Sequence, residues 1–339
     1  MNGKERVLKA ISFEKVDRVP TCVLDGHAWI CNQKGIAPEE LAMMDDEKAV
    51  DLLLAAYEKI DSDMVFTSAG NYMAFHDILS KVCGKDASKG EHPSAGEVLE
   101  LNPEEIIGQM DGHPAMESQR RRIEFMNQKV GNEKLVMAFS VAPLTMVSTL
   151  IGMDDLMMAT IEEPETVKKL MDFCMVITSY ISGDEVEHGA TAVSTADPVS
   201  SSKIISEDTF LDLSLPAIKK SASEWRRYGC PIMLHICGDS SGRLKNIRDL
   251  DIDIFSLDGG DLQQELDIAR GHYAIFGNIN TVSPLLNGSA DEVGKTALEL
   301  CQTAGTNGGF ILAPGCDLAP ATPLENVLAM MQAAKVAAR

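Results

Sequence analysis

Residues 232–238, Ile-Met-Leu-His-Ile-Cys-Gly, contain the pattern that decides the fold: an apolar run that ends in polar residues and a glycine. The apolar part does not alternate with polar residues, as is typical of a strand buried on both faces of a parallel sheet. The polar end marks the point where such a strand meets the loop to the next helix. This stretch is therefore predicted to be one strand of an α/β fold, followed by the start of its loop.

Eight apolar runs of this kind are spread along the 339 residues, with helical segments between them. They are Val19–Leu24, Met64–Thr67, Leu135–Phe139, Ala190–Thr195, Ile232–His235, Ile252–Leu257, Tyr273–Phe276 and Gly309–Ala313. Eight strands that alternate with helices favour a closed (β/α)8 TIM barrel over an open doubly wound sheet. No Gly-x-Gly-x-x-Gly or P-loop pattern supports a nucleotide-binding doubly wound sheet. No linker divides the chain, so residues 1–339 are expected to form a single domain.

Several helices carry explicit start and stop signals. Asn102-Pro103-Glu104-Glu105 offers an N-cap, a proline at the first helical position and a glutamate three residues after the cap. Ser289-Ala290-Asp291-Glu292 and Thr322-Pro323-Leu324-Glu325 both fit the capping box. Gly305 is well placed to end the helix that contains residues 297–301.

Three residues at the predicted carboxyl ends of strands form a candidate metal site, and this is the end of a barrel where active sites lie. His235 and Cys237 are two residues apart, so on a strand both side chains point to the same face. Cys316 follows the last predicted strand, which returns beside the earlier ones in a closed barrel. One nitrogen and two thiolates suit zinc, and three protein ligands leave a fourth position open, as in catalytic sites. Asp258, which ends a strand between them, is a candidate fourth ligand or a base beside the metal.

These residues also have a purely structural interpretation. His-x-Cys is a weak motif, and Cys316 alone could be a buried free cysteine. The other six cysteines have no ligand-like pairing and are expected to be reduced thiols of the core or surface: Cys22, Cys31, Cys83, Cys174, Cys230 and Cys301.

Composition and charge exclude several classes of function. The formal net charge is −21, so nucleic acid and anionic membrane surfaces would be repelled. The one dense basic cluster, Arg120-Arg121-Arg122, lies beside glutamates in a helical stretch and is interpreted as a solvated helix face. The N-terminus has no apolar segment of a signal peptide, and no run of about 18 apolar residues suggests a membrane span. We therefore expect a cytoplasmic protein with no membrane and no nucleic-acid partner.

The residues that flank the candidate ligands resemble those of the uroporphyrinogen decarboxylase superfamily. The resemblance rests on Leu234-His235-Ile236-Cys237-Gly238, Leu312-Ala313-Pro314-Gly315-Cys316 and the stretch from Pro320 to Val327. The opening Arg6-Val7 and Asp17-Arg18-Val19-Pro20 are similar to the N-terminus of that superfamily. Within it, the match is to the methylcobamide:coenzyme M methyltransferase branch.

This resemblance implies a (β/α)8 barrel that binds Zn²⁺ through His235, Cys237 and Cys316. It further implies that a thiol such as coenzyme M, activated at the open zinc position, takes a methyl group from a methyl-Co(III) corrinoid. No corrinoid-binding Asp-x-His-x-x-Gly pattern occurs in this chain, so the methylcobamide is expected to arrive on a separate corrinoid protein. The acceptor's identity and the oligomeric state stay open.

The sequence departs from the decarboxylases after the first predicted strand. There they carry an arginine-rich segment that holds substrate carboxylates, whereas this chain has Leu24-Asp25-Gly26-His27-Ala28-Trp29. Without arginine, a polycarboxylate would lack its counter-charges. Two alternatives nevertheless remain: a decarboxylase-like lyase with packing cysteines, and a non-catalytic corrinoid-docking subunit with a structural metal.

Other polar residues near the strand ends have weaker assignments. Lys203 could pair with an acceptor sulfonate, or be a solvated surface lysine. His27 and Trp29 could line the mouth or pack, and Asn278 and Asn280 could bind substrate or cap a turn. Asp197-Pro198 is expected to shape a loop that faces the site.

Overall fold

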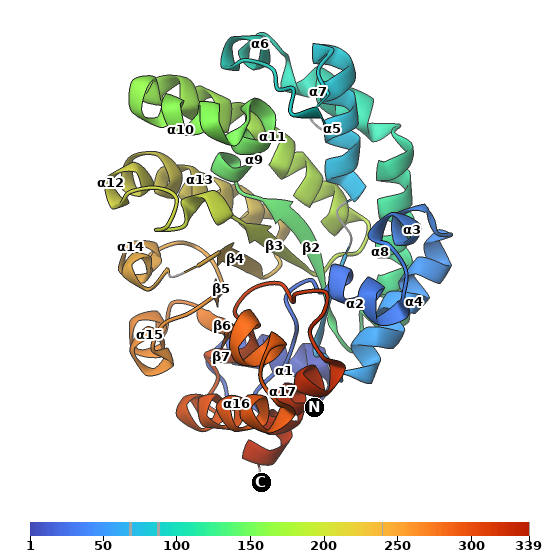
Figure 1. Ribbon diagram of the computed structural model, residues 1–339, viewed down its shortest axis with the longest axis vertical. Helices are drawn as coiled ribbons and strands as arrows, with labels where there is room; N and C mark the ends of the chain where they lie inside the picture. Colours follow the sequence, from blue (N-terminus) through green and yellow to red (C-terminus); the bar gives the residue numbers. More distant parts are fainter. Residues whose placement is uncertain (68–69, 87–88, 239, 339) are drawn as a thin grey trace.

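Seven parallel strands form one curled sheet in the computed structural model, which describes residues 1–67, 70–86, 89–238 and 240–338 (Figure 1). The strands pair in chain order, each with the next. They are β1 (Met64–Phe66), β2 (Leu135–Val141), β3 (Ala192–Ala196), β4 (Ile232–Ile236), β5 (Ile254–Leu257), β6 (Ala274–Ile279) and β7 (Phe310–Pro314). This confirms the predicted α/β class and seven of the eight predicted strands.

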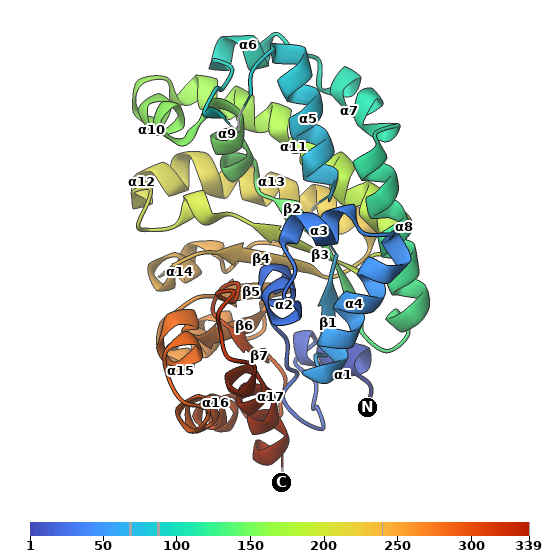
Figure 2. The same ribbon diagram turned by 45° about the vertical axis from the view of Figure 1, so that its right-hand side comes forward.

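Helices cover the outer face of the sheet, and the two chain ends lie at the same end of the molecule (Figures 1 and 2). Before β1 come α1 (Gly3–Ile11), α2 (His27–Lys34), α3 (Pro38–Met43) and α4 (Asp46–Lys59). Between β1 and β3 come α5 (Gly70–Cys83), α6 (Ala95–Leu99), α7 (Pro103–Asp111), α8 (Pro114–Val130), α9 (Pro143–Ile151), α10 (Met153–Glu162) and α11 (Pro164–Glu187). The remainder are α12 (Glu207–Thr209), α13 (Leu215–Trp225), α14 (Leu244–Ile247), α15 (Leu262–Ala269), α16 (Ala290–Ala304) and α17 (Leu324–Ala337).

The inner and outer faces of the sheet pack into separate hydrophobic clusters because alternate strand residues point to opposite faces. The outer cluster, between strands and helices, is the larger one. The inner cluster includes Met137, Met233, Ile254, Phe276 and Ile311, one from each of five strands. Towards the carboxyl ends of β4 and β5 the inward positions change from apolar to polar side chains. The lower layers thus stabilise the sheet and leave the upper layer for chemistry.

The predicted first strand, Val19–Leu24, is the exception, and its prediction as a regular strand is wrong. Within this segment only Thr21 makes a β-bridge, to Leu312 in β7. The Cys22 amide donates to the Leu312 carbonyl (3.1 Å), and the Leu312 amide donates to the Pro20 carbonyl (2.8 Å). Pro20 has no N–H of its own, which limits the ladder that this segment can form. The regular sheet is therefore seven-stranded rather than a closed barrel of eight.

A buried ion-pair cluster fixes this N-terminal segment against the start of β1. The Asp63 carboxylate accepts from Arg6 Nη1 (2.6 Å), Arg18 Nη1 (2.8 Å) and the Thr21 amide (2.8 Å). The Asp63 amide in turn donates to the Thr21 carbonyl (2.8 Å). Asp63 and both arginines are buried, so each charge depends on its partners for compensation. The arginines of the N-terminal motif thus hold residues 19–22 between β7 and β1.

Most of the predicted helix signals are confirmed. The Asn102 side chain caps α7, and Ser289 and Glu292 form a capping box at α16. Gly305 ends α16 with a φ of +68°, a conformation that favours glycine. The capping box predicted at Thr322 is wrong: α17 begins at Leu324, and no side chain caps it. The Thr322 carbonyl instead accepts from the Trp29 indole (2.8 Å).

No single helix among the described residues is long and apolar enough to cross a membrane. Only α9 and α10 together meet that test by length and composition, with a bend of 115° between them.

Candidate metal centre

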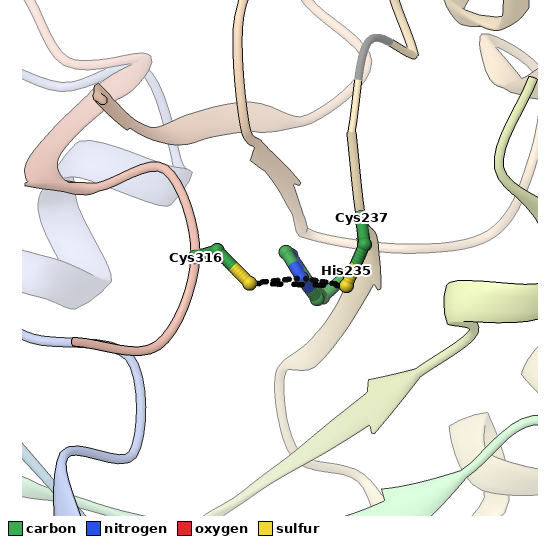
Figure 3. Close-up of side chains that lie close together, drawn as sticks. All are labelled: His235, Cys237 and Cys316. Carbon is green, nitrogen blue, oxygen red and sulfur yellow. Dashed lines mark hydrogen bonds between the residues drawn. The ribbon is translucent and has the colours of Figure 1, made fainter. Parts of the chain in front are cut away.

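Three potential metal ligands converge at the carboxyl end of the sheet. His235 lies near the carboxyl end of β4, Cys237 directly follows that strand, and Cys316 lies in the loop after β7 (Figure 3). His235 Nε2 lies 3.1 Å from Cys237 Sγ and 3.6 Å from Cys316 Sγ, and the two sulfur atoms are 3.8 Å apart. The structure therefore brings together the three residues that the sequence singled out, with their donor atoms facing one another.

The distances fit a tetrahedral zinc ion. With zinc–sulfur and zinc–nitrogen bonds of about 2.3 and 2.05 Å, two sulfurs should lie about 3.8 Å apart, and nitrogen and sulfur about 3.6 Å apart. The Cys237–Cys316 and His235–Cys316 distances match these values. The His235–Cys237 distance is about 0.5 Å shorter, which a small side-chain rotation corrects. Among the described residues, this is the one group of His, Cys and carboxylate side chains with such spacing.

The neighbouring strand fixes the orientation of the His235 ring. Ser256 of β5 is the register partner of His235, and its Oγ lies 2.9 Å from His235 Nδ1. A bound metal would take the Nε2 lone pair, and in that tautomer the serine oxygen would accept from Nδ1–H. Both side chains are buried, which leaves the ring little freedom.

The two cysteines share a proton when no metal is bound. A hydrogen bond from Cys237 and another from His235 lower the pKa of the Cys316 thiol to about 4. The same contact with Cys316, together with burial, raises the pKa of the Cys237 thiol. The contact between the two sulfurs therefore favours the thiolate form of Cys316, the form that binds a metal ion.

A glycine is required just before Cys316 because two loops approach closely there. A Cβ on Gly315 would lie 2.4 Å from the Asp258 carbonyl oxygen and 2.7 Å from Asp258 Oδ1. Any larger residue would push the Cys316 loop away from β5, and with it the third ligand.

Asp258 lies outside the group of ligand atoms. Its Oδ2 accepts from the Gly238 amide (2.7 Å), directly after Cys237. Its carboxylate thus bonds the loop that follows Cys237, and its role as a fourth ligand or a base beside the metal stays a prediction.

Asp197 is fully buried after β3 and anchors its loop, as predicted. Its carboxylate accepts from Thr145 Oγ1 (2.6 Å), Ser200 Oγ (2.5 Å) and Ser214 Oγ (3.3 Å). Burial raises the pKa of Asp197 although these hydroxyls favour its charged form.

The other candidates separate into packing and accessible residues. Trp29 is buried and packs, whereas His27 bonds the Phe66 carbonyl (3.2 Å) and approaches Asp25 (3.0 Å). Asn280 caps the turn after β6. Asn278 donates to the Gly260 carbonyl (3.1 Å), and its Oδ1 is buried without a partner among the described residues.

Lys203 is exposed, beside the loop that follows Cys237. A Cβ on Gly238 would lie 3.8 Å from Lys203 Cγ and 2.9 Å from Ser201 Oγ, so the loops after β3 and β4 touch here. The lysine is placed near the centre, but no contact ties it to the three ligands.

Sequence reasoning missed Ser256 altogether. It sits in the apolar run Ile254–Leu257 and resembles an ordinary buried strand residue. The only signal is its register opposite His235, which requires the pairing of β4 with β5.

Comparison with known proteins gives consistent relatives. The sequence model of the uroporphyrinogen decarboxylase (URO-D) family matches residues 2–336. The chain is 27% identical to the methylcobamide:CoM methyltransferase MtaA of Methanosarcina barkeri, covering 97% of this chain and 96% of that protein. It is 25% identical to uroporphyrinogen decarboxylase 2, chloroplastic, of Oryza sativa subsp. japonica, covering 97% of this chain and 86% of that protein.

A solved structure supports the fold over the whole chain. A methyltransferase from Methanosarcina mazei superposes with a TM-score of 0.77 at 23% identity, and covers 99% of both chains. The resemblance found in the sequence motifs is therefore confirmed: this chain belongs to the uroporphyrinogen decarboxylase family.

Proposed function

We propose that this protein is a zinc-dependent, corrinoid-linked methyltransferase that moves a methyl group from a methyl-Co(III) corrinoid to a thiol such as coenzyme M. The observation that carries the proposal is the group formed by His235, Cys237 and Cys316, one nitrogen and two sulfurs at zinc-like spacing. Three ligands at the carboxyl end of the sheet leave a fourth position for a substrate, as in catalytic zinc sites.

A zinc ion bound there would supply a Lewis acid that lowers the pKa of the acceptor thiol. The chain's own residues fix where this happens: Ser256 orients His235, and the β4 and β7 loops present the two cysteine sulfurs to one point. In the transfer, the acceptor S–H bond breaks and its proton leaves. The thiolate forms a bond to the methyl carbon, and the Co–C bond breaks with its electron pair on cobalt, giving Co(I) and a methyl thioether.

The nature of the substrates is supported by relatives and by the sequence. Relatives over nearly the whole chain include the MtaA protein of M. barkeri and a methylated-thiol–coenzyme M methyltransferase of Methanosarcina mazei, the latter 25% identical. The chain lacks an Asp-x-His-x-x-Gly corrinoid motif, so the methylcobamide would be carried by a partner protein.

The same proposal places the sheet in the (β/α)8 class, with residues 19–24 in the position of the first strand. The hydrogen bonds of Thr21 and Cys22 to Asp63 and Leu312 support this, because they join the two edges of the sheet.

The test is the zinc content of purified protein, combined with the cobalamin spectrum when methylcobalamin and a series of thiols are added. About one zinc per chain and thiol-dependent conversion to Co(I) would support the methyltransferase. Protein prepared without chelator that holds no zinc would overturn the proposal in favour of a decarboxylase-like lyase. Zinc that resists exchange, with no turnover even when candidate corrinoid proteins are supplied, would favour the docking subunit.

A further inference from the structure

Ser256 of β5 and Asp258, directly after it, contact the elements that carry the three candidate ligands His235, Cys237 and Cys316. We propose that Ser256 and Asp258, at the carboxyl end of β5, are positioning residues that pre-set the ligand geometry and thereby determine metal affinity. The inference rests on the proposed metal site and assigns it a supporting shell.

Ser256 acts on the first ligand. Its Oγ lies 2.9 Å from His235 Nδ1, in hydrogen-bond contact, and the two residues are register partners in adjacent strands. Because backbone pairing fixes both Cα positions, the hydrogen bond fixes the remaining freedom, the rotation of the ring. Partners of this kind around metal-bound histidines typically contribute about 10–100-fold in metal affinity.

Asp258 acts on the second ligand through the backbone. Its Oδ2 accepts from the Gly238 amide at 2.7 Å, one residue after Cys237. Gly238 has a φ of +74°, so the chain turns sharply there. A carboxylate that accepts from this amide fixes the turn, and the turn sets the direction in which the Cys237 side chain points.

The third ligand is positioned by contact with the same residue. Gly315 packs so closely on Asp258 that a Cβ would overlap both its carbonyl oxygen and Oδ1. Asp258 therefore forms the surface on which the Cys316 loop rests. Since the same carboxylate bonds the Cys237 loop, the two sulfurs are held relative to one another by one side chain.

This assignment differs from a direct role in coordination. It rests on the hydrogen bond and packing contacts that Asp258 makes with the two loops.

The experiment is a titration of metal-free protein with Co²⁺, a spectroscopic substitute for zinc, followed by visible absorption and by chelator competition. Ser256→Ala is expected to weaken Co²⁺ binding about 10–100-fold, with one ion still bound per chain. Ser256→Thr, which keeps the hydroxyl and suits a strand, should restore most of the affinity. Asp258→Asn, which replaces one acceptor oxygen by an amide group, should also weaken binding.

The matched control is Ser194→Ala, a buried strand serine with no hydrogen bond to the three ligands, which should bind Co²⁺ like the wild type. Thermal unfolding of each metal-free variant shows whether the fold is retained. Should Asp258→Asn fail to fold, Ser256→Ala and Ser256→Thr still test the proposal. If Ser256→Ala binds Co²⁺ with wild-type affinity, the positioning role proposed here is overturned, but the metal site is not. Absence of Co²⁺ binding in the wild type would overturn the metal site itself.

Discussion

The sulfur atoms of Cys237 and Cys316 lie 3.8 Å apart although 79 residues separate them in the chain. Each follows a different strand, β4 or β7, and the curvature of the sheet brings the two strand ends together. A pair of half-buried sulfurs at this distance, with a histidine nitrogen beside them, is well suited to binding a soft cation.

The first prediction concerns this pair. Cys316→Ala should lose zinc and thiol-dependent methyl transfer together, because two remaining ligands cannot hold the ion tightly. Metal analysis of the purified variant and the methylcobalamin assay measure both effects. Cys301→Ala, in the buried face of α16, should keep zinc and activity near wild type. Equal zinc in the Cys316→Ala protein would contradict the ligand assignment.

Gly315→Ala should separate the two loops. Its Cβ would overlap Asp258 by contacts as short as 2.4 Å, so we expect a loss of stability of about 1–3 kcal/mol and much weaker metal binding. Gly259→Ala is the matched control, because a Cβ there meets no atom within 4 Å. Denaturant unfolding and Co²⁺ titration of both variants provide the comparison, and equal behaviour of the two would refute the steric argument.

Metal removal should lower stability reversibly. A ligand present at 100 times its Kd stabilises the native state by about 2.7 kcal/mol, so chelated protein should unfold at a lower temperature and regain its Tm with added zinc. The shift should be absent in Cys316→Ala. A Tm that does not respond to zinc in the wild type would show that the folded state does not bind it.

Stability should also fall with rising pH because of Glu185. This side chain is fully buried on α11, where desolvation raises its pKa from 4.5 to about 8 despite hydrogen bonds from Gln119, Phe139 and Asn71. The folded state keeps a proton that the unfolded chain releases above about pH 4.5. The stability that the protonated Glu185 contributes is therefore complete below that pH and is lost as the pH rises to about 8. Between these values the free energy of unfolding should fall with a slope that approaches about 1.4 kcal/mol per pH unit.

The measurement is the free energy of unfolding in urea at pH 5.5 and pH 8, for example, in the wild type and Glu185→Gln. The variant cannot ionise, so its stability should change less over this range. Glu187→Gln, on the exposed face of the same helix, should keep the wild-type dependence. A Glu185→Gln variant with an unchanged slope would assign the pH dependence to other groups.

Asp63→Ala should be strongly destabilising, by about 3–5 kcal/mol, because it removes the buried carboxylate that Arg6 and Arg18 share. Urea unfolding measures the loss. Asp61→Ala, two residues earlier and half-exposed, is the control and should cost far less. A small effect in Asp63→Ala would show that Arg6 and Arg18 find other partners.

Much of the fold followed from the sequence because buried parallel strands leave a plain signal of continuous apolar runs. β4 carries His235 and β7 precedes Cys316, and both strands begin and end within one or two residues of their predicted bounds. The segment 19–24 has the same apolar composition but makes a single bridge, because its pairing depends on Pro20 and on the distant Leu312. An apolar composition predicts that a segment is buried, but it does not predict how many hydrogen bonds the segment makes to neighbouring strands.

The sequence predicted that His235, Cys237 and Cys316 lie together, but it did not predict the residues that support them. His-x-Cys is a weak motif on its own, and the prediction drew on the strand ends and on the family resemblance of the flanking residues. Ser256 and the contact between Gly315 and Asp258 depend on strand register and on loop approach, which no local pattern encodes. The supporting shell of a site is a property of the tertiary structure.

The pairing of Thr21 with Leu312 also determines when the protein can finish folding as it leaves the ribosome. Residues 19–24 are made long before β7, so this contact can form only after Leu312 has left the ribosome. Until residue 316 has emerged, the nascent chain displays His235 and Cys237 without their third partner. A metal ion at this centre would therefore meet all three ligands only after residue 316 has been made.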